Sequence, residues 1–181
     1  MLEQFYPTEC AESAYVVNYD AYYKKGIRGI LFDIDNTLVP HGEPASKDAE
    51  ALFELIHTMG FKTCLISNNK EERVKPFAEA VRSEYIFNAH KPSVVNYKRA
   101  ARQMGITEKE TLFIGDQIFT DIYGANRAGI ANILVKPIHA KEEIQIVLKR
   151  YLEKIILYFY TKNIVRNISG DMEKERQDLK R

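Results

Sequence analysis

Short apolar runs alternate with amphipathic segments along most of the chain. Strand-like runs lie at Gly29–Ile34, Lys62–Ser67, Glu84–Ala89, Thr111–Gly115 and Ile130–Val135, and helical patterns at Lys47–Met59, Glu71–Ser83, Ser93–Met104 and about Thr120–Ala128. Ser46 is a helix-start signal, and Gly60 and Gly105 are helix-stop signals. Strands and helices that alternate with short connections predict an α/β fold, a doubly wound, Rossmann-like parallel sheet with helices on both faces.

The two ends of the chain depart from this alternation. Residues 1–25 are rich in tyrosine and are expected to pack onto a core formed by residues 26–139. Residues 140–168 predict an amphipathic helix, and residues 169–181 form a charged tail. The apolar stripe of this helix, from Ile144 to Phe159, packs either on the sheet or on a second subunit of a homo-oligomer. With its basic flanks, it also suits a membrane interface.

Composition restricts the class of protein. A chain of 181 residues is most simply one domain, and its formal net charge of +1 gives no electrostatic reason to expect a nucleic-acid partner. Cys10 and Cys64 lie far apart without metal-ligand spacing, so a disulfide is not expected and a reducing compartment is favoured. The N-terminus lacks a secretory pattern and no stretch has the length of a membrane span, which predicts a cytoplasmic protein, with peripheral contact at the inner face of the membrane as the alternative.

Polar side chains follow four of the predicted strands. In a doubly wound sheet, ligands bind at the carboxyl ends of the strands. The residues that follow the strands there are Asp33, Asp35 and Thr37, then Ser67 and Asn68, then Lys91, and finally Asp116, Gln117 and Asp121. Each group alone is weak evidence because Asp and Asn are also common turn residues. Four strand ends that carry acids, a hydroxyl and a lysine together predict a site.

The chemistry of such a site follows from its side chains. Carboxylates in one crevice suit Mg²⁺, which shares its oxygen ligands between protein, water and phosphate. Asp33 could act as a nucleophile toward phosphorus and Asp35 as the acid and base. Ser67 and Lys91 would then bind the phosphoryl oxygens. These groups predict phosphoryl transfer from a phosphorylated substrate.

The motif order "DIDNT", "LISNN", "HKP" and "GDQIFTD" resembles that of the haloacid dehalogenase (HAD) superfamily of aspartate-nucleophile phosphatases, and more narrowly its YqeG-type, subfamily IIIA members. The resemblance implies that Asp33 is both nucleophile and metal ligand and that Asp116 completes the Mg²⁺ site. It also implies that the main-chain oxygen of Asp35 binds the metal, and that Asp121 binds it directly or through water. YqeG-type proteins are similar to the mitochondrial and plastid phosphatases that act on phosphatidylglycerophosphate.

Motif spacing bears on the substrate. About thirty residues separate Thr37 from Ser67, which leaves room for one helix rather than a cap domain. We therefore expect a capless enzyme with an open site, which suits a lipid headgroup or a phosphorylated macromolecule.

Other functional interpretations of the same residues remain open. Asp121 could equally be a helix-capping acid, and the four histidines do not cluster at metal spacing, so we expect them to be structural or solvent-facing. A phospho-acceptor signalling module also places acids, a hydroxyl and a lysine at strand ends, although its lysine usually comes last, whereas Lys91 precedes Asp116 here. A binding protein that keeps the fold without turnover is the third hypothesis.

Overall fold

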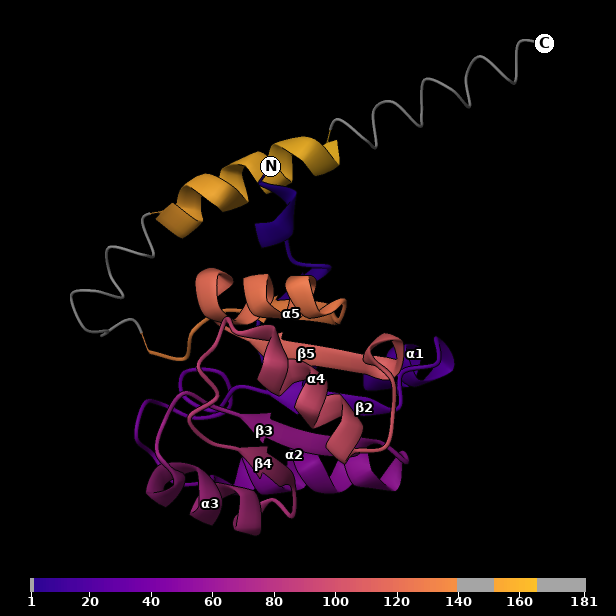
Figure 1. Cartoon of the computed structure of the whole chain (residues 1–181), viewed down its shortest axis with the longest axis vertical. Coiled ribbons are helices and arrows are strands. Elements are labelled where there is room, and N and C mark those ends of the chain that lie inside the picture. The colour runs from indigo at the N-terminus through magenta and orange to yellow at the C-terminus, as the bar shows by residue number, and fades with distance from the viewer. Residues whose placement is uncertain (1, 140–151, 166–181) are drawn as a thin grey trace.

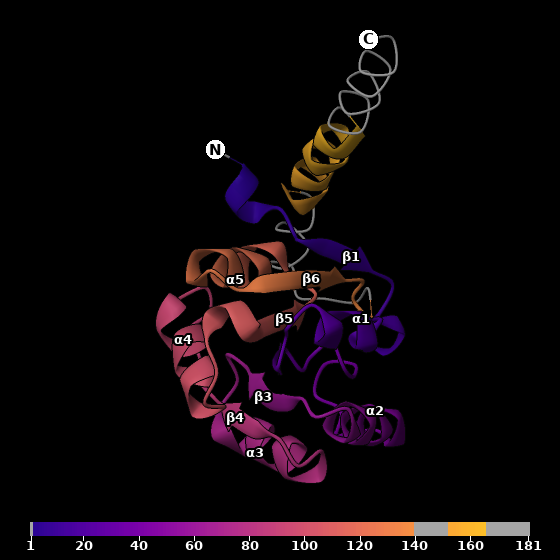
Figure 2. The same ribbon diagram turned by 90° about the vertical axis from the view of Figure 1, so that its right-hand side faces the viewer.

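The computed structural model describes residues 2–139 and 152–165. Six strands form one parallel sheet in the order β1-β6-β5-β2-β3-β4 (Figures 1 and 2). Their bounds are β1 Glu9–Ala11, β2 Gly29–Phe32, β3 Lys62–Ile66, β4 Glu84–Ile86, β5 Thr111–Gly115 and β6 Ala131–Val135. The helices are α1 Tyr19–Lys24, α2 Lys47–Thr58, α3 Glu71–Ala80, α4 Val94–Gln103 and α5 Tyr123–Ala128. Short 3-10 turns lie at Glu3–Phe5, Ala14–Val16 and Glu108–Glu110, and a π-helical turn at Ile118–Ile122 precedes α5.

The strands are buried on both faces because helices cover both. Along β2, Ile30 and Phe32 join one core cluster, with side chains of α1, α2 and α3, whereas Leu31 joins a second cluster with α4 and α5. This alternation follows from the period of two in a strand. Full burial of both faces explains why β2, β3 and β5 are almost continuously apolar. The expectation of a doubly wound sheet is therefore confirmed.

The edge strand β1 is an element that the sequence did not predict. Glu9–Ala11 is only three residues long and carries no apolar run. It pairs in parallel with β6, with Cys10 opposite Leu134. Two hydrogen bonds fix this pairing, from Thr8 N to Asn132 Oδ1 (3.2 Å) and from Asn132 N to Thr8 Oγ1 (3.1 Å). A segment that was expected only to pack onto the core thus supplies a strand of the sheet.

No cap domain is present in the described residues. The connection from β2 to β3 contains the single helix α2, and the connection from β3 to β4 contains only α3. At the carboxyl ends of β2 and β3, the chain therefore forms loops and does not insert a second domain.

A helix at residues 152–165 stands outside the two helical layers, next to the N-terminal segment (Figure 2). Ile156 joins a small cluster with Ile118, Ile122 and Leu134, and the rings of Tyr6 and Tyr160 lie 5.3 Å apart. Of the described part of the predicted apolar stripe, Ile156 packs against Leu134 of β6, whereas Leu152, Ile155 and Phe159 are exposed. The part of the stripe before residue 152, and the predicted tail, lie outside the described residues. Within the described part of the chain, no helix is both long and apolar enough to cross a membrane.

Candidate active site

The site lies where the strand order reverses. From β2 the chain moves outward through β3 to β4, then returns to β5 on the other side of β2. Loops leave such a point in opposite directions and open a crevice at the carboxyl ends of the strands. Asp33 and Asp35 follow β2 at this point, and Asp116 follows the neighbouring β5.

A cavity of about 150 Å³ occupies this crevice. Six of the nine predicted site residues line it, namely Asp33, Asp35, Ser67, Asn68, Lys91 and Gln117. The other three make contact with that lining or with one another: the Thr37 hydroxyl donates to Asp33 Oδ2 (3.5 Å) and to Asp116 Oδ1 (3.4 Å), and Asp121 contacts Lys91. The structure therefore brings all nine residues together from four strand ends.

Lys91 forms two buried ion pairs at the centre of the site. Its Nζ lies 2.6 Å from Asp33 Oδ1 and 2.7 Å from Asp121 Oδ1, and its side chain is only 4% exposed. Burial raises the pKa of Asp33 to about 6, although the Lys91 ammonium acts in the opposite direction. Burial alone would lower the pKa of Lys91, but the carboxylates of Asp121 and Asp33 outweigh it and raise that pKa above its ordinary value. Lys91 is therefore a fixed positive charge next to Asp33.

Asp35 has a different environment from Asp33. Its carboxylate accepts hydrogen bonds from Arg73 (2.9 Å), from the Gly42 backbone N–H (2.8 Å) and from the Asn69 amide. Arg73 was not among the predicted site residues, because an arginine in the first turns of a surface helix carries no distinguishing pattern. His41, expected to be structural or solvent-facing, is exposed but lines the cavity, with Nδ1 3.9 Å from Asp35 Oδ1.

Local backbone geometry fixes the loop after β2. Asn36 adopts a left-handed conformation with φ of 62°, which Asn tolerates better than most residues. Its N–H donates to the carbonyl of Val39 (2.7 Å), and its own carbonyl accepts from Ile138 N (3.0 Å). This tight turn directs the side chains of Asp33 and Asp35 into the same cavity.

Two further contacts hold the other strand ends in place. The side chain of Asn68 accepts a hydrogen bond from Lys91 N (2.7 Å), which ties the loop after β3 to the loop after β4. At Gly115, an added Cβ would lie 2.5 Å from Asp121 Oδ2. A glycine is required there because Asp121 approaches the end of β5 too closely for any side chain.

Three carboxylates of this site suit a cation. Asp33, Asp116 and Asp121 each place one oxygen within 4.8 Å of the others, and all three residues are buried. Their donors are hard oxygens from separate loops, the donor type that divalent ions such as Mg²⁺ prefer. The residues present therefore fit a divalent metal.

A parallel α/β sheet with an acidic cluster at its switch point, no cap, and the motif order described above defines a HAD-like hydrolase. The HAD-hydrolase-like family model matches residues 88–145. A protein of Bacillus subtilis strain 168 described as probable phosphatase YqeG is 34% identical over 159 residues, which cover 87% of this chain and 92% of that protein. The chain belongs to this YqeG-type family of HAD phosphatases.

Two other similarities are more distant. The chloroplastic and mitochondrial phosphatidylglycerophosphate phosphatase 1 of Arabidopsis thaliana is 25% identical over 164 residues, which cover 76% of this chain but only 45% of that longer protein. A crystal structure of an uncharacterized protein from Listeria monocytogenes serotype 4b superposes with a TM-score of 0.51 at 18% identity, covering 65% of this chain and 86% of that one. The latter similarity shows the fold alone.

Proposed function

We propose that this protein is a Mg²⁺-dependent phosphomonoester hydrolase that acts through an aspartyl-phosphate on Asp33. The observation that carries the proposal is the position of Asp33, which lines the open cavity while its carboxylate contacts the Lys91 ammonium at 2.6 Å. A carboxylate nucleophile beside a fixed cation suits attack on a phosphoryl group, whose charge the cation neutralises.

The proposed reaction has two displacements. In the first, a carboxylate oxygen of Asp33 bonds to phosphorus, the bond from phosphorus to the ester oxygen breaks, and Asp35 protonates the departing alcohol. In the second, Asp35 removes a proton from a water molecule, and that water attacks phosphorus, which releases inorganic phosphate and restores Asp33. Asp35 lines the same cavity as Asp33 but makes its own contacts, with Arg73 and Gly42, so the two acids can have separate roles.

The remaining predicted residues would hold the phosphoryl group and the metal. Ser67 and Asn68 line the cavity and would donate to phosphoryl oxygens together with Lys91. Asp33, Asp116 and the main-chain oxygen of Asp35 would hold Mg²⁺, with Asp121 as a direct or water-mediated ligand. A bound Mg²⁺ would supply positive charge to the phosphoryl oxygens. Thr37 would support these ligands through its hydroxyl, which contacts Asp116, and Gln117 would line the cavity beside them.

We further propose a lipid phosphate, with phosphatidylglycerophosphate as the candidate, as the substrate. The relative from Arabidopsis thaliana bears that substrate in its name, although this chain spans less than half of it. The helix at 152–165 supports a membrane contact, because Leu152, Ile155, Tyr158 and Phe159 are exposed and fall on one side of a helix. The catalytic core at 26–139 would then work at the inner face of a membrane, with the C-terminal helix as its contact.

The test is phosphate release from phosphatidylglycerophosphate in mixed micelles, with and without Mg²⁺, alongside a soluble sugar phosphate. We expect rapid, Mg²⁺-dependent release from the lipid that the substitution Asp33→Asn abolishes. Equal, slow release from both substrates would refute the lipid assignment but keep the phosphatase. No release from either substrate would refute the proposed function.

A further inference from the structure

The π-helical turn at Ile118–Ile122 holds one acid of the active site. Asp121 lies in this turn and is fully buried, and its Oδ1 contacts Lys91 Nζ at 2.7 Å. Its Oδ2 accepts a hydrogen bond from Gln117 N (3.1 Å), at the start of the same turn. Lys91 in turn contacts Asp33 at 2.6 Å. The geometry at the start of the turn therefore affects the charge that lies beside the proposed nucleophile.

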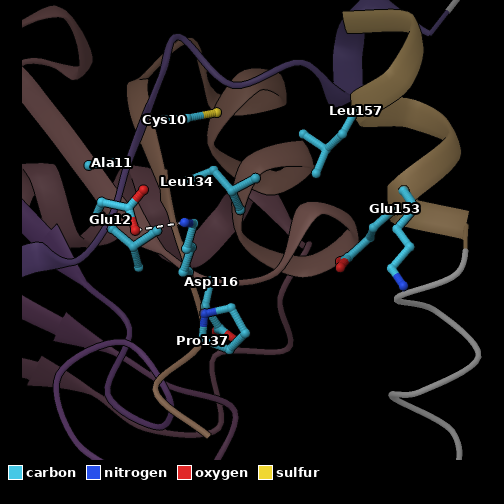
Figure 3. A pocket seen from close by; sticks show the side chains of 11 residues that line it. Cys10, Ala11, Glu12, Asp116, Leu134, Pro137, Glu153 and Leu157 are labelled. Carbon is cyan, nitrogen blue, oxygen red and sulfur yellow. Dashed lines mark ion pairs between the residues drawn. The ribbon is translucent and has the colours of Figure 1, made fainter. Parts of the chain in front are cut away.

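A carboxylate from a distant helix caps the start of this turn. The first N–H groups of a helical element have no partner within it, and Gln117, at the N-cap position, makes no side-chain cap hydrogen bond. The N–H of Ile118 donates instead to Glu153 Oε1 (2.8 Å). Glu153 belongs to the helix at 152–165 and is only 5% exposed. Figure 3 shows its side chain extending from that helix toward the core.

The same face of the helix packs against the same turn. Ile156, one turn after Glu153, joins a small apolar cluster with the first and last residues of the π-helical turn. Beside this contact, the ends of β1 and β6 and the helix enclose a mostly apolar cavity of about 410 Å³, with Leu134 and Leu157 on opposite walls (Figure 3). At the cavity the helix does not rest directly on the sheet, so its position relative to the turn depends on Glu153 and Ile156.

Tyr97 of α4 holds the other end of the turn. Its hydroxyl donates to the carbonyl of Thr120 (2.8 Å) and lies 3.3 Å from the carbonyl of Asp121. The carbonyl end of the turn is thus fixed by a helix of the core, whereas its N–H end depends on the C-terminal helix. Glu153 is therefore the contact through which the position of that helix reaches the active site.

We propose that Glu153 is a positioning residue for the active site. By accepting the hydrogen bond from Ile118 N, it fixes the start of the turn, and with it the carboxylate of Asp121 that contacts Lys91. The inference rests on the proposed function, because it concerns the charge beside the proposed nucleophile. It makes the helix at 152–165 necessary for a complete active site, although no described residue of that helix lines the active-site cavity.

The first experiment observes the Lys91 ammonium by NMR, in protein labelled with heavy nitrogen at lysine. A buried ammonium that contacts two carboxylates is protected from hydrogen exchange, and its signal is assigned by its absence in Lys91→Arg. Glu153→Ala should shift this signal and speed the exchange severalfold, because Asp121 is no longer held in place. An unchanged signal would overturn the inference. This measurement needs no turnover, so it remains decisive if the proposed function fails.

Three further variants separate positioning from a general loss of stability. Glu153→Gln keeps an oxygen acceptor and should leave the Lys91 signal close to that of wild type. Glu153→Asp keeps the charge but shortens the side chain, so it should shift the signal, and it replaces Glu153→Ala if that variant fails to fold. Tyr19→Phe removes another buried hydrogen bond, from the Tyr19 hydroxyl to Ala14 O (2.6 Å), and should leave the signal unchanged. Equal shifts in all these variants would overturn the inference.

The second experiment measures kcat and KM at a temperature where every variant is folded. The substrates are phosphatidylglycerophosphate in mixed micelles and para-nitrophenyl phosphate, which involves no lipid contact. We expect Glu153→Ala to lower kcat about tenfold or more on both substrates with little change in KM, because the alignment of Asp33 matters most when its oxygen attacks phosphorus. Glu153→Gln and Tyr19→Phe should stay near wild type.

The kinetic outcomes distinguish the inference from the proposed function. A kcat for Glu153→Ala equal to that of Tyr19→Phe would overturn the positioning role and keep the phosphatase. A loss confined to the lipid substrate would assign Glu153 to lipid contact instead, which also overturns the inference. If the wild type hydrolyses neither substrate, the proposed function fails, and the NMR signal alone decides whether Glu153 positions Lys91.

Discussion

Replacing Lys91 by methionine should strongly destabilise the folded protein. The substitution keeps most of the side-chain volume but removes the ammonium that contacts Asp33 at 2.6 Å and Asp121 at 2.7 Å. The three side chains are 4%, 10% and 1% exposed, so water does not replace the lost partner. Removing one member of a buried ion pair costs about 3–5 kcal/mol. For a chain of this size, that corresponds to a fall in Tm of roughly 6–20 °C.

The chain contains a matched control for this prediction. Lys136 contacts Glu12 at the same distance of 2.6 Å, but both side chains are about 70% exposed. An exposed pair contributes about 0–1 kcal/mol, so Lys136→Met should change stability little. Urea denaturation of both variants in the presence of a chelator, which removes any divalent ion, measures the difference. A Lys91→Met variant whose free energy of unfolding stays within about 1 kcal/mol of wild type would refute the reasoning.

Three further predictions concern other parts of the structure. Asp35→Asn should reduce kcat about 10²–10⁴-fold as the acid and base is lost, with an unchanged near-UV spectrum; phosphate release at wild-type level would exclude this role. Glu153→Ala should lower the free energy of unfolding in urea by about 1–3 kcal/mol, because it leaves the buried N–H of Ile118 without this acceptor, whereas Glu153→Gln should cost less. Burial, with a smaller effect of Arg82, lowers the pKa of His57, so the neutral form is favoured in the folded state. The stability from this group is present above the unfolded pKa of 6.5 and is lost as pH falls through the lower folded pKa, so thermal melts should show a smaller loss on acidification in His57→Gln than in wild type.

The main sheet and the grouping of the candidate site residues could be predicted from the sequence because both depend on local patterns. The strand β2 is apolar on both faces, and Asp33 and Asp35 follow it. The sequence was therefore enough to predict that these two acids lie at the end of a buried strand. The same holds for Lys91 and Asp116. The predicted helices begin and end close to their observed bounds, since caps such as Ser46, whose side chain accepts from Ala49 N, are also local.

Features that depend on contacts between distant segments were not predicted. The strand β1 exists because Thr8 and Asn132 exchange hydrogen bonds across the sheet, and nothing in the sequence Glu-Cys-Ala indicates it. Arg73 contacts Asp35 only because α3 begins beside the loop after β2. The apolar cavity likewise needs β1, β6 and the C-terminal helix to meet, which no local pattern encodes.

The most direct test of the central claim is to identify the phosphorylated residue during turnover. The protein would be mixed with a phosphomonoester and Mg²⁺, quenched in acid at short times, digested and examined by mass spectrometry. The account predicts a phosphoryl group on the peptide that contains Asp33, which decays as inorganic phosphate appears and is absent in Asp33→Asn. Turnover without any phosphorylated peptide would contradict the aspartyl-phosphate. A phosphorylated Asp33 that persists without phosphate release would instead identify a phospho-acceptor module.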